Sequence, residues 1–405
     1  MDALTTPLNW QRVRLGDIGI TISGLVGKTK QDFINGNAKY ITFLNVLNNV
    51  IIDTSILENV KIYPNEKQNS FKKYDLFFNT SSETPKEVGM CAVLLDDIDQ
   101  VFLNSFCFGF RIFDKAVDSL FLSYLINSEI GRKAFENLAQ GSTRYNLSKS
   151  GFNNVCLFLP PLNEQIAIAN ILSTLDNYLH ALRALILKKE SVKKALSFEL
   201  LSQRKRLKGF NQAWQKVRLG DICEFGNGGA YETLIVENGD FKLISLNSVD
   251  IDGNLKNTMK RVNFYDNSLK QGDIVMVLSD VAHGDFLGLC AVILSNDYVL
   301  NQRMGRLRIR NDCINILFLR LYINANQKYF KMQGQGSSQL NLSKKAIEDF
   351  EILLPPLNEQ SAIADILSAL DKEIASLKNK KRQFENIKKA LNHDLMSAKI
   401  RVLKK

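Results

Sequence analysis

The sequence lacks the signals that direct a chain into or across a membrane. None of its apolar runs reaches the roughly 20 residues that a membrane-spanning helix needs. The first residues, Met1-Asp-Ala-Leu-Thr-Thr-Pro7, contain neither a basic lead nor an apolar signal core. We therefore expect a cytoplasmic protein. Its 405 residues, 45% of them hydrophobic, are enough for more than one core.

Patterns typical of catalytic and metal sites are also lacking. The six cysteines show no CxxC spacing, and we expect them to be buried free thiols, with Cys91 and Cys290 at matching places in two apolar segments. The three histidines are scattered, with no acid or cysteine set that indicates a metal. We find no nucleoside-triphosphate loop, and no cofactor loop or Asn-Pro-Pro-aromatic motif of an adenine methyltransferase. Asp240-Phe-Lys242 resembles a nuclease fragment but lacks the upstream acid.

What the chain does contain is an internal repeat. Trp10-Gln-Arg-Val-Arg-Leu-Gly-Asp-Ile18 returns 204 positions later at Trp214, and Leu159-Pro-Pro-Leu-Asn-Glu-Gln165 returns 195 positions later at Leu354. A repeat of about 200 residues has the size of a domain and is too long for a solenoid. The sequence therefore predicts two tandem modules related by a pseudo-two-fold.

Basic residues gather at the ends of the two copies. The formal net charge is +10 and the pI is about 9.1, which favours a polyanionic partner. Residues 188–208 hold eight Lys or Arg against two acids, and residues 372–405 hold eleven against three. A solvated lysine-rich helix surface explains any single one of these residues equally well.

Apolar spacing predicts a long helix after each Pro-Pro pair. In both copies the seam alternates steps of three and four, which is typical of two helices packed as an antiparallel coiled coil. The expected seam positions are Ile168, Ile171, Leu175, Tyr178, Leu182, Leu185, Lys189, Val192, Leu196 and Glu199, and Ile363, Ile366, Leu370, Glu373, Leu377, Lys380, Phe384, Ile387, Leu391 and Asp394. About 40 residues make a rod of roughly 60 Å, which we interpret as a spacer.

The remaining segments indicate mixed α/β (α+β) modules with strongly bent sheets. Short β-rich runs, 40–44, 75–78, 90–95, 273–278 and 289–294, alternate with Gly, Asn, Asp and Ser clusters, and one helix is expected near 120–137 and again near 316–331. The predicted domains are a first module (1–157), a central helix (158–208), a second module (209–352) and a C-terminal helix (353–405).

The middles of the two copies are almost unrelated, although their edges match. Polar loops in these middles carry Asn, Gln, Ser, Thr, Lys and Arg, the side chains that read base edges in DNA. Solvent-exposed turns are rich in the same residues, so each loop residue can also be explained as part of an ordinary turn.

Together, the Trp-x-x-Val-Arg-Leu-Gly-Asp-Ile openings, the Gly-Ser-x-x-x-Asn-Leu-Ser loops at 141 and 336, and both Leu-Pro-Pro-Leu-Asn-Glu-Gln motifs resemble the specificity subunit of type I restriction-modification enzymes. The resemblance covers the whole chain. It implies two target recognition domains, each reading one half of a split, asymmetric DNA target, and two conserved helices that set the gap and dock two modification (methyltransferase) subunits. Restriction (motor-nuclease) subunits join for cleavage.

The resemblance also implies that this chain is not itself an enzyme and binds no cofactor. S-adenosylmethionine, and ATP with Mg, are expected on partner subunits. A non-catalytic coiled-coil scaffold with two protein-binding ends is the alternative interpretation. It explains the helices but not the divergent polar loops.

Candidate site residues follow from the loops and the helix starts. The DNA-contact candidates are Lys28, Lys30, Asn45, Thr80, Ser81, Asn104, Ser142, Thr143 and Arg144 in the first module, and Asn227, Asn247, Ser279, His283, Asn301, Gln302, Arg303, Ser337, Ser338 and Gln339 in the second. Arg144, His283 and Arg303 are the expected base readers, whereas Asn104 and Asn301 recur and are expected to touch the backbone or hold the fold. The expected partner-facing residues are Glu164, Gln165, Glu359 and Gln360.

Overall fold

The computed structural model divides into two compact units that differ from the domain boundaries predicted along the chain. Unit 1 combines residues 1–183 with 379–405, and unit 2 contains residues 184–378. The structure describes the chain except residues 1–8, 137, 139–140, 142–144, 282–283 and 403–405. Two helices, α6 (Leu162–Leu201) and α11 (Leu357–Met396), are divided between the units, so each unit contains a segment of α6 and a segment of α11.

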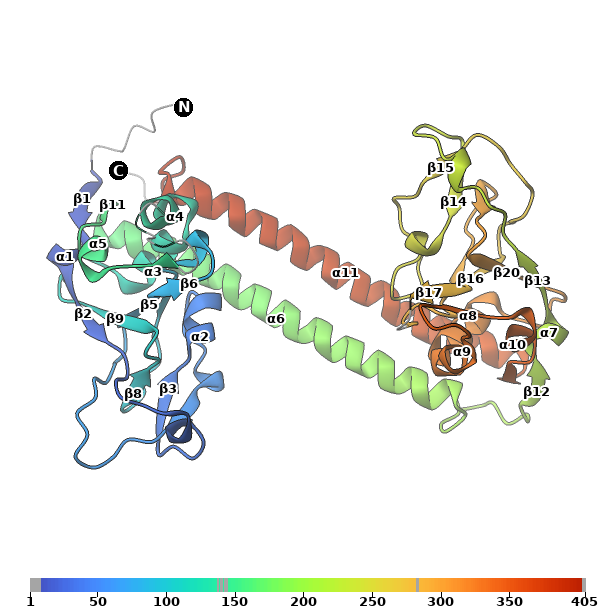
Figure 1. Cartoon of the computed structure of the whole chain (residues 1–405), viewed down its shortest axis with the longest axis horizontal. Coiled ribbons are helices and arrows are strands. Elements are labelled where there is room, and N and C mark those ends of the chain that lie inside the picture. Colours follow the sequence, from blue (N-terminus) through green and yellow to red (C-terminus); the bar gives the residue numbers. More distant parts are fainter. Residues whose placement is uncertain (1–8, 137, 139–140, 142–144, 282–283, 403–405) are drawn as a thin grey trace. The chain divides into compact units, whose positions relative to one another are not determined.

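Unit 1 is built from small sheets and short helices (Figure 1). Its strands are β1 (Gln11–Arg14), β2 (Gly19–Ser23), β3 (Ala38–Ile41), β4 (Glu58–Val60), β5 (Leu76–Asn79), β6 (Ser81–Ser82), β7 (Cys91–Val93), β8 (Val101–Leu103), β9 (Cys107–Ile112), β10 (Tyr145–Asn146) and β11 (Cys156–Leu159). Its short helices are α1 (Leu15–Ile18), α2 (Phe43–Asn48), α3 (Ser119–Asn127), α4 (Glu129–Glu136), α5 (Lys149–Asn153) and the 3-10 turns η1 (Lys30–Phe33), η2 (Thr54–Ile56) and η3 (Pro85–Glu87). The main sheet has the order β2-β9-β5-β7, and a second sheet has the order β4-β3-β8 with β3 and β8 parallel.

Unit 2 repeats this plan. Its strands are β12 (Gln215–Arg218), β13 (Cys223–Asn227), β14 (Phe241–Ile244), β15 (Arg261–Val262), β16 (Ile274–Val277), β17 (Ser279–Val281), β18 (Cys290–Val292), β19 (Tyr298–Leu300), β20 (Met304–Ile309), β21 (Gln339–Asn341) and β22 (Glu351–Leu354). Its short helices are α7 (Leu219–Ile222), α8 (Ile316–Ala325), α9 (Gln327–Gln333), α10 (Lys344–Glu348), η4 (Glu232–Leu234) and η5 (Leu246–Ser248). The orders β13-β20-β16-β18 and β15-β14-β19 match those of unit 1 strand for strand.

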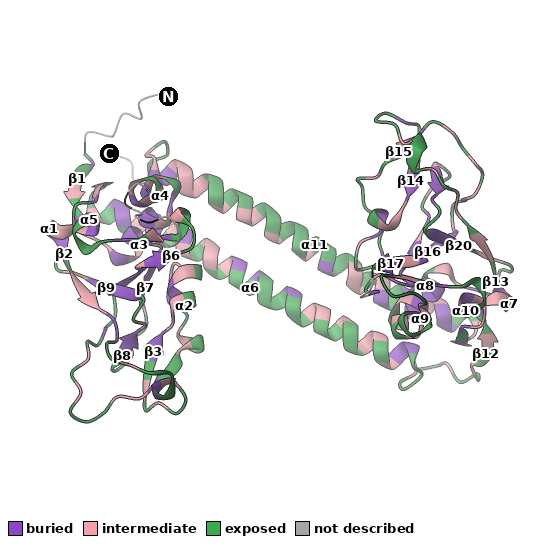
Figure 2. Ribbon diagram, viewed as in Figure 1, coloured by how far each residue is buried: buried purple, intermediate pink, exposed green. Residues whose placement is uncertain are grey.

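The central strands of the two main sheets, β5 and β16, are buried on both faces, which explains their continuous apolar runs (Figure 2). In β5, Leu76 and Phe78 join one core while Phe77 joins another, because successive side chains of a strand point to opposite faces. In β16, Ile274 and Met276 face the helices while Val275 packs toward the second sheet. The predicted mixed α/β class with an internal repeat is confirmed.

Three local predictions need correction. The strand expected over 40–44 ends at Ile41, because Thr42 caps α2 by accepting a hydrogen bond from the Asn45 backbone N–H at 3.2 Å. The single helix expected near 120–137 is two helices, since Ser128 Oγ hydrogen-bonds at the break between α3 and α4. Unit 2 has the same break at Asn326, between α8 and α9.

The seam of the long helices has a different register from the predicted one. In the structure the first seam residue, 168, is followed by residue 172, where the prediction had residue 171. As a result Ile186 is buried at 7% exposure, whereas Leu185 is exposed at 38%. The described seam positions are 168, 172, 175, 179, 182, 186, 189, 193, 196 and 200 in α6, and 363, 367, 370, 374, 377, 381, 384, 388, 391 and 395 in α11. Both helices are also shorter than predicted, because Gln203 and Ala398 adopt left-handed backbone conformations (φ 59° and 56°) after them.

Within each unit, ion pairs join α6 to α11 at positions related by the repeat. In unit 2, Lys193 pairs with Asp371, and Glu190 with Lys378. In unit 1, the equivalent pairs are Lys388 with Asp176 and Arg183 with Glu385. The equivalent of the Lys189–Glu373 pair of unit 2 is a ring contact in unit 1, between Phe384 and Tyr178 at 4.7 Å. The contacts between the two helices within each unit therefore recur at the 195-residue offset of the sequence repeat.

The seam register predicts unequal effects of two neighbouring substitutions. Ile186→Ala should lower the free energy of unfolding by about 2 kcal/mol, because a buried side chain is deleted. Leu185→Ala should change it by less than about 0.5 kcal/mol. Urea unfolding measures both, and equal losses would contradict the register.

Four of the six cysteines are buried, as expected, but Cys156 is half-buried and Cys313 is exposed. Burial raises the pKa of the Cys223 thiol to about 12 and also raises the pKa values of Cys91 and Cys290. Among the described residues, no helix combines the length and apolar character that a membrane crossing requires.

Candidate nucleic-acid interface

A β-turn before the last strand of each main sheet is repeated in the two units. In unit 1 the backbone N–H of Cys107 donates to the carbonyl of Asn104 at 3.1 Å, and in unit 2 Met304 donates to Asn301 at 3.0 Å. We call residues 104–107 and 301–304 the tip turns. Their central residues, 105–106 and 302–303, are all exposed.

The same backbone hydrogen bonds fix both tip turns. The N–H of Asn104 donates to Ile41, and that of Asn301 to Ile244, both at 3.0 Å. The carbonyl of Phe106 accepts from Thr80 N at 2.9 Å, just as the carbonyl of Arg303 accepts from Leu278 N at 3.0 Å. The two turns therefore present different side chains from one backbone frame.

A glycine packs against each tip turn. Gly24 follows β2, and Gly228 follows β13 at the equivalent place. A Cβ built at Gly24 would lie within 3.0 Å of the Asn104 carbonyl oxygen, and one built at Gly228 would lie within 3.0 Å of the Asn301 carbonyl oxygen. Only glycine allows this close approach of two backbones.

In unit 1 the neighbours of the tip turn include two of the predicted contact residues. The Thr80 hydroxyl donates to the Phe106 carbonyl at 2.8 Å, and Ser81 lies buried in β6, opposite Asn146 of β10. Asn104 is half-buried, and its Oδ1 accepts from the Phe106 N–H at 2.8 Å. Thr80, Ser81 and Asn104 therefore lie at one end of the main sheet.

Unit 2 brings a larger set of predicted residues to the same end. Asn227 pairs with Gly305 beside the tip turn, and Ser279 donates to Asn341 Oδ1 at 2.7 Å. Gln339 pairs with Val281 across β21 and β17. Ser337 and Ser338 are exposed just before β21.

Asn301 has a structural role within the unit 2 turn. It is 4% exposed, and its amide accepts from Tyr231 N and donates to Glu232 at 2.8 Å. Gln302 also donates to Glu232 at 3.1 Å. Hydrogen bonds from its own backbone N–H and from both amides lower the pKa of Glu232. These contacts join the tip turn to the start of η4.

The remaining candidates are in varied surroundings or lie outside the described residues. Asn45 is fully buried, and its amide bonds the backbone of Asp53 at 2.9 and 3.0 Å, so in this conformation it is not available to DNA. The Lys28 side chain is 4% exposed, and its ammonium pairs with Glu66 and lowers the pKa of that carboxyl to about 2. Lys30 and Asn247 are exposed, in η1 and η5. Ser142, Thr143, Arg144 and His283 lie outside the described residues.

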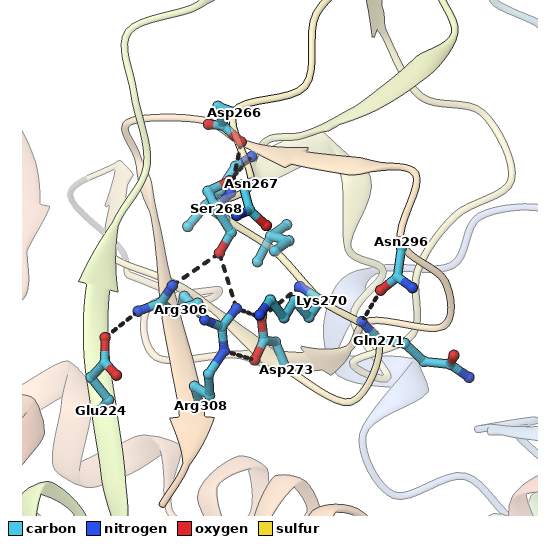
Figure 3. A network of polar contacts seen from close by, with 12 residues as sticks. Glu224, Asp266, Asn267, Ser268, Lys270, Gln271, Asp273, Asn296, Arg306 and Arg308 are labelled. Carbon is cyan, nitrogen blue, oxygen red and sulfur yellow. Dashed lines mark hydrogen bonds and ion pairs between the residues drawn. The ribbon is translucent and has the colours of Figure 1, made fainter.

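Two further arginines of β20 belong to a structural network (Figure 3). Arg306 pairs with Glu224 at 2.5 Å, and Arg308 makes a two-point contact with Asp273 at 2.8 and 2.7 Å. Both also donate to the Ser268 carbonyl. Arg303, before the same strand, is exposed. The network therefore holds β20 in place, whereas the central residues of the tip turn before it, 302–303, are exposed.

A family profile described as the type I restriction modification DNA specificity domain matches residues 7–189 and 211–386. The chain belongs to this family. The two matches cover both copies of the repeat, so this is a tandem pair of specificity domains. Membership of this family does not favour the alternative interpretation as a coiled-coil scaffold with two protein-binding ends.

Known proteins of this family span the whole chain. The type I restriction enzyme MjaVIII specificity subunit of Methanocaldococcus jannaschii is 26% identical over 99% of this chain and 95% of its own length. A crystal structure of a type I restriction-modification S subunit from M. genitalium aligns with a TM-score of 0.64 at 18% identity, covering 97% of both chains. A structure from a study of complex assembly in a type I system aligns with a TM-score of 0.55 at 17% identity, covering 96% of this chain and 98% of that one. These structural matches support the fold.

The four predicted partner-facing residues of these specificity domains are buried, which corrects the sequence prediction. Glu164 accepts two hydrogen bonds from Arg401, at 2.7 and 2.9 Å, and Glu359 accepts two from Arg206, at 3.1 and 2.6 Å. The amides of Gln165 and Gln360 bond backbone groups of their own units; their partners are Ala116, Asp118, Pro160, Cys313, Asn315 and Pro355. These side chains anchor the helix starts and do not form a docking surface.

The DNA-contact candidates predicted from the sequence did not include Phe106 of unit 1. Its side chain is 55% exposed at the tip turn. The signal was present, because Phe106 stands two residues after Asn104 as Arg303 stands two residues after Asn301. Within the described residues, no group of three or more His, Cys, Asp or Glu is placed to hold a metal ion.

Proposed function

We propose that this chain is the DNA-reading subunit of a type I restriction-modification complex, in which each unit reads one half of an asymmetric, bipartite target. The observation that carries the proposal is the pair of tip turns, which share a backbone frame and differ in their exposed side chains. Different side chains on the same backbone conformation suit two different half-sites, because side-chain chemistry distinguishes base edges. The family match supports the same function.

The proposal extends to partners. The relatives named above are specificity subunits, and one solved relative comes from work on assembly of a type I system. We propose that two modification subunits dock on the outer faces of α6 and α11, with restriction subunits joining for cleavage in the cytoplasm. The two 40-residue helices would then set the gap between half-sites. S-adenosylmethionine, and ATP with Mg, would bind the partner subunits, and this chain would be non-catalytic.

A mobility-shift assay in low and moderate salt tests the proposal. The chain, assembled with its modification subunits, should bind duplex DNA with an affinity that falls steeply with salt, because released counterions drive phosphate binding. The isolated chain, incubated with S-adenosylmethionine and DNA, should transfer no methyl group. Salt-independent binding, or methylation by the chain alone, would refute it.

Arg303→Ala should relax base selection in one half-site only. A two-point arginine–guanine contact is worth about 1–3 kcal/mol of discrimination, so selection at that base should fall by roughly 5- to 150-fold. Methylation-sensitive sequencing of a genome modified by the variant complex measures this at every position of the target. Equal loss over all sequences would show instead that Arg303 binds phosphate.

A further inference from the structure

A chain of hydrogen bonds fixes the side chain of Gln302, the second residue of the unit 2 tip turn. The backbone N–H of Tyr231 donates to Asn301 Oδ1 at 3.2 Å, and Asn301 Nδ2 donates to Glu232 Oε1 at 2.8 Å. Gln302 Nε2 lies 3.1 Å from each carboxylate oxygen of Glu232. Asn301 is 4% exposed, whereas Glu232 and Gln302 are exposed. The chain therefore runs from a buried residue of the tip turn to one that a ligand can reach.

Each hydrogen bond in this chain can run in only one direction. A backbone N–H only donates, so the Asn301 carbonyl oxygen faces Tyr231 and its amino group faces Glu232. Hydrogen bonds from its own backbone N–H and from the two amides lower the pKa of Glu232, which keeps this carboxylate ionised at neutral pH. An ionised carboxylate only accepts, so the amino group of Gln302 faces Glu232. Turning the Gln302 amide over would place its carbonyl oxygen against the carboxylate.

The rest of the Gln302 amide matches the edge of adenine. Its two N–H bonds diverge too widely to reach both oxygens of one carboxylate, so one N–H bonds Glu232 and the other remains. Charge repulsion keeps the carbonyl oxygen away from the carboxylate, so the N–H that bonds Glu232 is the one farther from that oxygen. The oxygen and its adjacent N–H therefore remain for a ligand. This acceptor and donor pair is the one that contacts N6 and N7 of adenine in the major groove.

On the basis of the proposed function, we infer that Gln302 selects an adenine of the second half-site and that Glu232 is its positioning residue. Unit 1 lacks this arrangement. Its tip turn has Ser105 in place of Gln302, and at the 204-residue offset of the repeat Lys28 takes the place of Glu232. The Lys28 ammonium pairs with Glu66. The effect of the Glu232 contact should therefore be confined to one half-site.

Replacement of adenine by 7-deazaadenine tests this inference, because it removes only the N7 acceptor. The target of the assembled complex is first mapped by methylation-sensitive sequencing, and each adenine of the target is then replaced in turn. At one position, 7-deazaadenine should weaken binding by the unsubstituted protein about 3- to 10-fold, the effect of one hydrogen bond. Gln302→Ala should bind the adenine probe more weakly by at least this factor and should bind the two probes equally at that position.

Glu232→Gln separates positioning from folding. The new amide keeps an oxygen that accepts from Asn301, so the thermal transitions should be unchanged. Its amino group can also donate to the Gln302 carbonyl oxygen, which allows the Gln302 amide to turn over. The preference for adenine over 7-deazaadenine should therefore fall by at least about twofold, while selection of the first half-site stays intact. Thr233→Ala, an exposed neighbour in η4, is the control and should keep the full preference.

The outcomes distinguish this inference from the proposed function. The inference is overturned if no adenine is sensitive to loss of N7, or if Gln302→Ala keeps that sensitivity. An unchanged preference in a folded Glu232→Gln protein would overturn the positioning role. If Glu232→Gln does not fold, Gln302→Ala still decides the selection of adenine, because it only shortens an exposed side chain. A protein that selects no bipartite target at all would instead overturn the proposed function.

Discussion

Replacing Arg206 with alanine is expected to lower the free energy of unfolding of unit 2 by about 3–5 kcal/mol. The Glu359 carboxylate is fully buried, and Arg206 satisfies both of its oxygens, at 3.1 and 2.6 Å. Trp214 Nε1 donates a third hydrogen bond at 3.0 Å. Removal of the guanidinium leaves the buried carboxylate with the indole donor alone, which is unfavourable for a desolvated charge.

The two tryptophans allow this loss to be measured in one unit. Trp10 belongs to unit 1 and Trp214 to unit 2, so in a Trp10→Phe background the fluorescence of Trp214 follows unit 2 during urea unfolding. Lys193→Ala, which breaks a solvent-accessible pair, is the matched control and should cost at most about 1 kcal/mol. Arg206→Leu combined with Glu359→Leu should recover most of the stability, because no buried charge remains. A single-variant loss no larger than that of Lys193→Ala would contradict the role of the pair.

The repeat explains both the successes and the failures of the sequence prediction for the long helices. Motifs recurring at a fixed offset identified both helices, and the offset also relates their ion pairs. The predicted register was wrong because at several places the predicted seam residue and the observed one are adjacent and both apolar, as are Leu185 and Ile186. The two registers are distinguished at the ends of the helices. There the predicted register places Glu199 and Asp394 in the seam, whereas the observed register buries Leu200 and Leu395.

The polar side chains of the candidate site were harder to assign from sequence. Asn45 was expected to contact DNA, yet it is buried within α2, whereas Asn247 is exposed in η5. Glu164 was expected on the surface because it is charged, but its burial depends on Arg401, 237 residues away. Contacts at such separations have no local signature. The tip turns could be found only by comparing which residues follow Asn104 and Asn301.

Gly228→Val is expected to abolish selection of the second half-site while leaving the first intact. The added Cβ meets the backbone carbonyl of Asn301, which cannot move aside without displacing the tip turn. Because the turn presents two candidate reading residues, Gln302 and Arg303, and each good base contact is worth about 1–3 kcal/mol, about 2–6 kcal/mol of discrimination should be lost. Overpacking should also lower the stability of unit 2 by about 1–3 kcal/mol.

Gly24→Val is the matched variant for this test, because its Cβ meets the Asn104 carbonyl in the same way. Binding of the assembled complex is compared on probes in which one half-site or the other is scrambled. Each glycine variant should become indifferent to scrambling of its own half-site and stay sensitive to scrambling of the other. If Gly228→Val still discriminates the second half-site like the unsubstituted protein, the tip turn does not read DNA. If both half-sites fail together in a complex that remains assembled, the two units do not read independently.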